Sequence, residues 1–204
     1  MSCNSCPYSE DIASRKAALR KEIRAKRRSL GDEEVCAASK AAAEKFMELD
    51  AVKKARLILS YMPAKNELDV RRINTALTAL GKQVAYPLCV ENGGLRLYVP
   101  ETADALRPGS YGILEPDPAM SSEVFPADLD LIIVPAVAFT SDCMRLGQGG
   151  GYYDRLLEKT SAVTVGIGYD FQLLPELPIE EHDKALDIIV TPSAVFTRRN
   201  DVQN

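Results

Sequence analysis

The chain has 204 residues, of which 46% are hydrophobic and 26% charged, and its formal net charge is −4. These values are ordinary for one soluble globular domain. No apolar run approaches the roughly 20 residues that span a bilayer, and the first residues lack a basic region followed by an apolar stretch. We therefore expect a cytoplasmic protein with no secretory signal and no membrane partner.

The cysteines do not indicate a disulfide framework, because the five of them are odd in number and scattered. Cys3 and Cys6 form a Cys-x-x-Cys pair, but no second pair lies nearby and His182 is the only histidine. A structural zinc site needs about four ligands, so a flexible leader over residues 1–8 is the simpler interpretation. We expect a single α/β catalytic domain over residues 9–204.

The first predicted element is a basic helix over about residues 10–29. Residues 15–28 carry eight cations and one acid, so this segment has a charge of +7 and the rest of the chain −11. The asymmetry indicates an anionic partner, which could be nucleic acid, a membrane or a phosphate compound. Lys16, Arg20 and Arg24 lie four residues apart and share one helical face. That face is either solvated or directed at a ligand.

Strands and helices alternate along the remaining chain. A second helix is predicted at 32–49, after which the hydrophobic period changes to that of strands. The further elements, in chain order, are a strand at 57–62, a helix at 70–80, strands at 83–88 and 95–99, a long loop at 100–128, a strand at 129–137, a helix at 152–159, and strands at 162–167 and 187–191. This alternation indicates right-handed crossovers and a mostly parallel sheet covered on both faces. We predict an α/β fold, a single-domain three-layer sandwich.

A glycine-rich loop follows the strand at 129–137, at the edge of the sheet where ligands bind in open α/β folds. Gly147, Gly149, Gly150 and Gly151 lie within five residues and directly precede a predicted helix. Glycines bring backbone N–H groups close to a ligand, and a helix start adds unpaired donors, which suits an anion. The spacing fits neither a Walker A loop nor a Rossmann fingerprint. A flexible connection remains the plain alternative.

The residues beside the glycines favour a ligand site. Arg145 can pair with phosphate, and Tyr152 and Tyr153 can flank a planar ring. Asp154 can either serve the helix dipole or hold Mg²⁺, which prefers one or two carboxylates plus phosphate oxygens. Asp183, just before the last strand, could supply a second carboxylate.

One acidic residue that follows the first predicted strand also enters the hypothesis. Glu67 follows the strand at 57–62, so it can reach the same edge of the sheet as the glycine loop. Its alternative role is an acid at the start of the helix at 70–80.

Several of these segments match one known family. The most specific is Arg145-Leu-Gly-x-Gly-x-Gly-Tyr-Tyr-Asp154, and the others, in the same order as in the family, are residues 16–20, 61–69, 111–116 and 182–183. With these segments the chain resembles the 5-formyltetrahydrofolate cyclo-ligases, also called 5,10-methenyltetrahydrofolate synthetases. The resemblance covers nearly the whole chain after residue 8.

The resemblance implies an ATP- and Mg²⁺-dependent cyclisation of 5-formyltetrahydrofolate to 5,10-methenyltetrahydrofolate. ADP and phosphate would be released through a phosphorylated formyl (imidate) intermediate. The partners would be these small molecules, and we expect a monomer that binds no nucleic acid.

The resemblance also implies roles for individual residues. The catalytic residues would be Arg145, Lys16 and Arg20. The ATP contacts would be Lys16, Arg20, Arg145, Leu146, Gly147, Gln148, Gly149, Gly150, Gly151, Tyr152 and Tyr153. The folate contacts would be Glu67, Tyr61, Gln148, Gly149, Gly150, Gly151 and Tyr152, and the metal ligands Asp154 and Asp183. Some relatives carry basic residues where this chain has Gln148 and Gly150, which leaves more of the phosphate charge to Arg145, Lys16 and Mg²⁺.

Two other functions are compatible with the residues alone. A non-catalytic nucleotide- or RNA-binding regulator would use the basic helix, although no aromatic residues are interleaved with its cations for stacking. A sugar-phosphate isomerase on a similar sheet would need a well-placed base and no ATP.

Overall fold

The computed structural model describes residues 7–64, 66–90, 93–109, 112–181 and 183–198. Most of the predicted leader, with Cys3 and Cys6, lies outside these residues, as does His182. Among the described residues, no helix is both long and apolar enough to cross a membrane.

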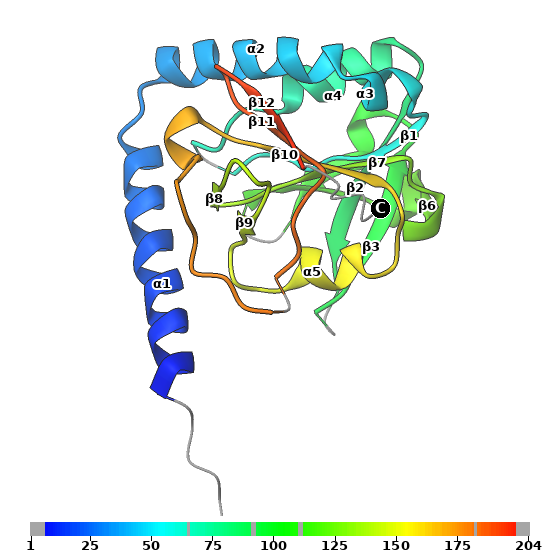
Figure 1. Ribbon diagram of the computed structural model, residues 1–204. Helices are drawn as coiled ribbons and strands as arrows, with labels where there is room; N and C mark the ends of the chain where they lie inside the picture. The colour runs from blue at the N-terminus through cyan, green and yellow to red at the C-terminus, as the bar shows by residue number, and fades with distance from the viewer. Residues whose placement is uncertain (1–6, 65, 91–92, 110–111, 182, 199–204) are drawn as a thin grey trace, which may run out of the picture.

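Five α-helices and twelve strands make up the described fold (Figure 1). The helices are α1 (Pro7–Arg28), α2 (Asp32–Glu48), α3 (Asp50–Lys54), α4 (Arg71–Ala79) and α5 (Tyr152–Leu157). The strands are β1 (Leu57–Leu59), β2 (Gln83–Cys89), β3 (Leu95–Pro100), β4 (Leu106–Pro108), β5 (Leu114–Pro116), β6 (Ser121–Val124), β7 (Leu131–Val134), β8 (Ala138–Phe139), β9 (Arg145–Leu146), β10 (Val163–Ile167), β11 (Ile188–Val190) and β12 (Val195–Thr197).

The main sheet has eight strands in the order β12-β11-β10-β7-β1-β2-β3-β6. Its five central strands, from β11 to β2, pair in parallel, and β12, β3 and β6 add antiparallel strands at the two sides. The central strand β7 is buried at every residue, as expected of a parallel strand covered on both faces. The predicted α/β fold with a mostly parallel sheet is confirmed.

Helices cover both faces of this sheet. Helices α2, α3 and α4 lie on one face and α5 on the other (Figure 1). Because successive strand residues point to opposite faces, Ile58 packs with Phe46 of α2 and Ile73 of α4, whereas Leu59 belongs to the cluster that contains Leu156 of α5. The two clusters form the two cores of a three-layer arrangement.

The predicted loop over residues 100–128 is wrong in part. Strand β6 completes the main sheet beside β3, and β4 pairs with β5 in a separate two-stranded sheet. The sequence of β6, Ser121-Ser-Glu-Val124, is polar because this strand lies at the edge of the sheet. It therefore lacks the apolar pattern by which a strand is predicted.

The strand expected at 129–137 is shorter than predicted. Strand β7 ends at Val134 because Pro135 has no N–H to continue the ladder. The chain then forms a small hairpin, in which β8 pairs with β9, and the glycine loop begins only after β9. Strand β12, which pairs antiparallel with β11, was not predicted.

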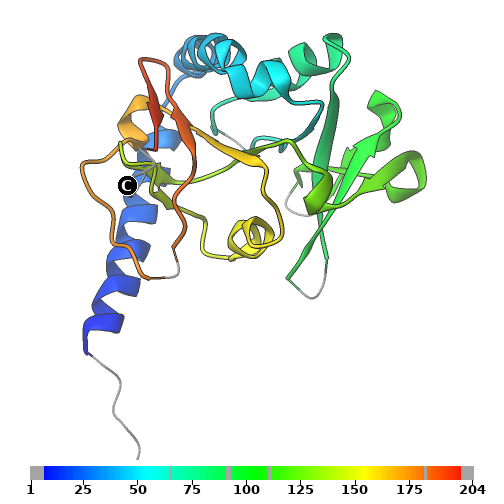
Figure 2. The same ribbon diagram turned by 45° about the vertical axis from the view of Figure 1, so that its right-hand side comes forward.

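Helix α1 does not cover a face of the sheet. Both views place it beside the β8–β9 hairpin, at the side of the molecule away from β6 (Figures 1 and 2). Ile23 is fully buried there against Val137, Ala138 and Leu146, with Leu19 packed on the same cluster. This apolar contact directs the cationic face of α1 at the loop that follows β9.

One carboxylate connects the N-terminal ends of the neighbouring parallel strands β1 and β7. The Asp130 carboxylate accepts hydrogen bonds from the backbone N–H groups of Arg56 (2.7 Å) and Leu57 (2.9 Å). These two amides lower the pKa of Asp130 below 3.8 because they favour the ionised form.

Asp130→Ala is expected to lower the free energy of unfolding by about 1–2 kcal/mol at neutral pH. Because the folded pKa is depressed, this stabilisation is present above pH 3.8 and is lost as the pH falls through the folded pKa. Urea unfolding at pH 7 and at acidic pH measures it, with Asp50→Ala, an exposed acid on α3, as the control. A deficit that stayed constant with pH would contradict the explanation.

Candidate functional site

The glycine loop lies between β9 and α5. Gly149 has a φ of +103° and Gly151 a φ of +67°, both in the region that disfavours side chains. Gly151 is the residue from which α5 begins. Arg145 on β9 is buried beneath the loop, and a Cβ on Gly147 would lie 3.0 Å from its Nη1. The loop therefore lies directly over an arginine guanidinium.

A polar cavity of about 300 Å³ opens on one side of the loop. It brings together residues from α1, β9, the glycine loop, α5 and the segment before β11. Its lining residues are Ala13, Lys16, Arg20, Arg145, Leu146, Gly147, Gly149, Gly151, Asp154, Glu180, Asp183 and Lys184. Four are cations and three are acids, so positive charge is in slight excess. Most of the predicted ATP contacts and both predicted metal ligands thus line one cavity.

Lys16 is held by acids from the far end of the sequence. Its Nζ lies 2.7 Å from Glu180 Oε2 and 2.6 Å from Asp183 Oδ2. Burial lowers the pKa of Lys16, but the hydrogen bonds to Asp183 and Glu180 outweigh it and the net shift is upward. The ammonium group therefore stays charged, and an incoming phosphate would share it with these two carboxylates.

Arg20 supports the loop itself. Its Nε donates to the carbonyl oxygen of Gly147 at 2.9 Å, and a Cβ on Gly149 would lie 3.5 Å from its Cζ. Burial, followed by repulsion from Arg24, lowers the pKa of Arg20, yet a guanidinium remains charged in proteins. Arg20 thus adds a positive charge to the polar cavity while it fixes one loop carbonyl.

Asp154 pairs with Arg145 through one oxygen, in a contact between Oδ1 and Nη2. Its side chain is 41% exposed, so the carboxylate also faces the cavity. The Asp183 Oδ2 accepts from Lys16 and from the backbone N–H of Glu180. The described residues contain no group of three or more His, Cys, Asp or Glu able to hold a metal ion. Two carboxylates on one polar cavity nevertheless suit Mg²⁺, which takes its other ligands from phosphate and water.

A second, more apolar cavity of about 180 Å³ lies against the glycine loop. Its walls come from the β2–β3 hairpin, the segment after β7, and the loop with the first residues of α5. The lining residues are Pro87, Cys89, Leu95, Pro135, Arg145, Gly147, Gln148, Gly149, Gly150, Gly151, Tyr152, Tyr153 and Asp154. The two cavities share Arg145, Asp154 and three of the glycines. The loop therefore separates a charged compartment from one suited to a planar ring.

The two tyrosines of the loop differ in their surroundings. Tyr153 is partly buried and packs against the core on the α5 face, and burial raises the pKa of its hydroxyl. That hydroxyl has no hydrogen-bond partner among the described residues. The Tyr152 ring lies under the guanidinium of Arg155, 5.3 Å from its Cζ, and that guanidinium also donates to the carbonyls of Gly93 and Gly150.

The structure places the predicted folate residues Glu67 and Tyr61 less directly. Tyr61 is buried in the core on the α4 face, and burial raises the pKa of its hydroxyl well above 10.0. Glu67 lines neither cavity but accepts a hydrogen bond from Gln148 of the loop at 3.3 Å. Both roles stay predictions, and Glu67 reaches the apolar cavity only through Gln148.

Four charged residues at the site were not predicted to have a role in it. Arg24 and Arg27 on α1 contact Gln148 and Glu67, and Glu180 and Lys184 line the polar cavity. Little in the sequence indicated the two arginines. Arg24 continues the i, i+4 series of Lys16 and Arg20, whereas Arg27 has no spacing that separates it from the other cations of the helix. Only the packing of α1 shows that Arg24 and Arg27 face Gln148 and Glu67.

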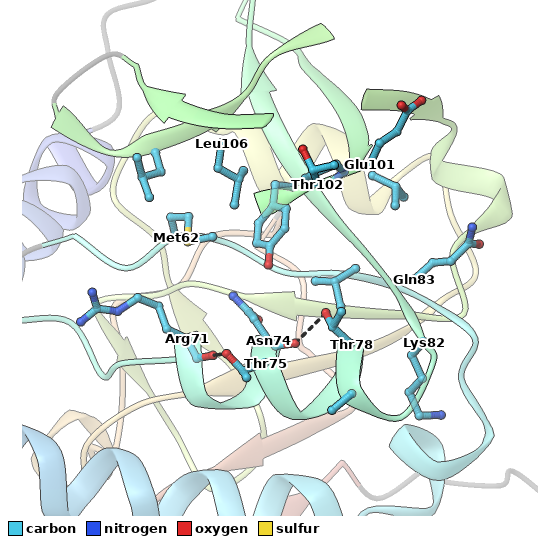
Figure 3. Close-up of a pocket in the computed structure, with 16 residues that line it drawn as sticks. Met62, Arg71, Asn74, Thr75, Thr78, Lys82, Gln83, Glu101, Thr102 and Leu106 are labelled. Atoms are coloured by element: carbon cyan, nitrogen blue, oxygen red, sulfur yellow. Dashed lines mark hydrogen bonds between the residues drawn. The ribbon is translucent and has the colours of Figure 1, made fainter. Parts of the chain in front are cut away.

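A larger cavity, of about 740 Å³, lies elsewhere, between α4, strands β2 and β3, and the β4–β5 hairpin. Figure 3 shows Asn74 and Thr78 of α4 on one side of it and Leu106 of β4 on the other. None of the predicted site residues lines it. Size alone therefore does not identify the functional site.

The backbone of Gly149 allows a direct test of the loop. Gly149→Ala should be strained because of the φ of +103°, costing about 1–3 kcal/mol locally. We expect this variant to lose affinity for ligands on both sides of the loop. Gly81→Ala is the matched control, since Gly81 has a φ of +74° with open space around it at the end of α4. Equal ligand affinities in the two variants, measured by calorimetry, would contradict the loop's role.

Comparison with known proteins gives the family of this chain. Residues 12–192 match the model of the 5-formyltetrahydrofolate cyclo-ligase family. This chain belongs to that family. The 5-formyltetrahydrofolate cyclo-ligase of Escherichia coli K12 is 32% identical over 179 residues, which cover 85% of this chain and 98% of the relative. A probable 5-formyltetrahydrofolate cyclo-ligase of Schizosaccharomyces pombe is 31% identical, covering 89% and 97% of the two chains.

Solved structures of the family share the fold. The solution structure of the 5,10-methenyltetrahydrofolate synthetase of Aquifex aeolicus has a TM-score of 0.83 and 34% identity, covering 93% of this chain and 95% of that one. The synthetase of Mycoplasma pneumoniae has a TM-score of 0.71 and 27% identity, covering 87% and 98%. The family resemblance predicted from the Arg145–Asp154 segment is confirmed.

Proposed function

We propose that this protein converts 5-formyltetrahydrofolate and ATP into 5,10-methenyltetrahydrofolate, ADP and phosphate, in a reaction that requires Mg²⁺. The single observation that carries the proposal is the glycine loop with a charged cavity on one side and an apolar cavity on the other. A nucleotide phosphate suits the first and a pterin ring the second. Family membership supports the same substrates.

The first step joins the two substrates at the loop. The formyl oxygen of the folate attacks the γ-phosphorus of ATP, the bond from that phosphorus to the bridging oxygen breaks, and ADP leaves. Lys16, Arg20 and Arg145 lie on the charged side of the loop, where they stabilise charge on the transferring phosphoryl group. Arg145 lines both cavities, so it can contact the oxygen that forms the new bond.

The second step closes the ring. N10 of the same folate attacks the activated formyl carbon, the carbon–oxygen bond breaks, phosphate leaves, and the N10 proton passes to solvent. This step needs the two reacting atoms to be held together more than it needs a side-chain nucleophile. Tyr152 and Tyr153 line the apolar cavity and would orient the ring there.

Asp154 and Asp183 are the residues that would hold Mg²⁺. When bound, the ion would neutralise phosphate oxygens and so lower the cost of bringing two anions together. Asp154 is the stronger candidate ligand of the two, because it pairs with Arg145 through Oδ1 alone and its side chain is 41% exposed, against 18% for Asp183.

One assay tests the function. Purified protein is mixed with Mg-ATP and 5-formyltetrahydrofolate, and the near-ultraviolet chromophore of the methenyl product is followed. We expect product only when ATP and Mg²⁺ are both present, in equal amount to the ADP released. Folded protein that forms no product under these conditions would overturn the proposal. Salt-sensitive RNA binding without turnover would then favour the regulator.

A further inference from the structure

Arg27 is a buried arginine at the end of α1, and it has no role in the reaction steps proposed above. It is 8% exposed, and arginine is almost never buried at this level unless it is paired. Its Nη1 lies 3.1 Å from Glu67 Oε1, and the Glu67 side chain is itself only 12% exposed. The Arg27 Nε has no hydrogen-bond partner among the described residues. A buried charge pair with an unmatched donor is costly for folding, which indicates that Arg27 does more than stabilise the fold.

The partner carboxylate is held on both oxygens. Glu67 Oε2 accepts from the backbone N–H of Ala64 at 3.0 Å, and Oε1 accepts from Arg27 and from Gln148 Nε2 at 3.3 Å. Both oxygens of this carboxylate act as acceptors, and the guanidinium of Arg27 beside Oε1 supplies the opposite charge in the buried setting. Arg27 thereby fixes the atom to which Gln148 donates.

Gln148 is an exposed residue of the glycine loop, and the contacts that begin at Arg27 end on it. Its Oε1 accepts from Arg24 Nη2 at 2.6 Å while its Nε2 donates to Glu67. With acceptor and donor both engaged, the side-chain amide has one orientation. Gln148 lines the apolar cavity but not the polar one. A change in its position should therefore affect one cavity selectively.

We propose that Arg27 is a positioning residue for the folate, acting through Glu67 and Gln148 to fix one wall of the apolar cavity. The inference rests on the proposed function, because it takes the occupant of that cavity to be 5-formyltetrahydrofolate. Arg27 itself contacts neither cavity. Substitution of Arg27 should therefore weaken the affinity for folate and leave the affinity for ATP unchanged.

The test compares Arg27→Met with Arg28→Met, which removes the same charge from the exposed neighbouring residue. Calorimetry measures the Kd of 5-formyltetrahydrofolate and of Mg-ATP, each alone. For Arg27→Met we expect the Kd for folate to rise about tenfold, because roughly one charge-assisted hydrogen bond is lost. The Kd for ATP should change by less than about twofold. Arg27→Lys keeps the charge and should recover most of the folate affinity. The KM values in turnover should show the same split.

Equal weakening of ATP and folate in Arg27→Met would overturn the inference, because it would indicate a merely structural role. So would a folate Kd equal to that of Arg28→Met. If Arg27→Met does not fold, Arg27→Met/Glu67→Met removes both buried charges, a replacement that is often neutral for stability. Wild-type folate affinity in that double variant would likewise overturn it. Absence of turnover in the wild-type protein would instead reject the proposed function.

Discussion

Arg145→Ala is expected to lower kcat/KM by about 10²–10³-fold, the usual cost of removing one preorganised group that stabilises transition-state charge. Arg145 lines both cavities, is 6% exposed, and pairs with Asp154. Among the described residues it is the one cation that lines both cavities, so in the proposed reaction it would face both the phosphate and the attacking oxygen. Methenyl product formation under saturating and limiting ATP and folate measures kcat and both KM values.

The matched control for Arg145 is Arg107→Ala. Arg107 also pairs with an aspartate, Asp117, but on β4, and it lines neither cavity beside the loop. We expect this control to keep wild-type activity. Arg145→Lys should retain part of the activity because the charge is kept while the planar fork of donors is lost. Activity of a folded Arg145→Ala variant within about threefold of the control would contradict the role of Arg145.

Asp154→Asn is expected to lower kcat by at least about 100-fold and to raise the Mg²⁺ concentration needed for half-maximal activity. The asparagine preserves the size of the side chain but removes the charge that a hard cation requires. Titration of activity with Mg²⁺, together with calorimetric binding of Mg²⁺ in the presence of a non-hydrolysable ATP analogue, measures the effect.

Asp117→Asn is the control for Asp154, since it neutralises the aspartate of the Arg107 pair. Its Mg²⁺ titration should overlay that of the wild type. A low activity of Asp154→Asn with an unchanged Mg²⁺ midpoint would indicate that Asp154 acts only by orienting Arg145. That result would remove it from the proposed metal site.

Much of the fold could be predicted from local sequence patterns because its elements have clear apolar faces or runs. The buried strand at 131–134 and the helices α2 and α4 were predicted within a few residues of their observed bounds. Errors concentrate where neighbours decide the structure. Strand β6 is polar and exists because β3 offers an open edge, and β8 and β9 are two residues each, held by pairing with one another.

Some residues of the site could be predicted from the sequence, and others are placed there only by packing. Arg145, Asp154 and the glycines are contiguous, so their spacing alone indicated an anion-binding loop. The contribution of α1 was left open by the sequence, because a solvated face and a ligand-facing one have the same pattern of cations. Burial of Ile23 against the β8–β9 hairpin settles which side of α1 faces the loop. It also separates Arg27, which is buried, from Arg28, which is exposed.

The α/β fold, the glycine loop flanked by an arginine and an aspartate, and the family could all be predicted from the residues alone. These follow from short-range patterns, in which hydrophobic period and residue spacing act within a few turns of the chain. Two sets of contacts are visible in the three-dimensional structure alone. Lys16 forms ion pairs with Glu180 and Asp183, and Glu67 accepts hydrogen bonds from both Arg27 and Gln148. Contacts between residues this far apart depend on how α1 packs beside the β8–β9 hairpin, a long-range effect that no local pattern encodes.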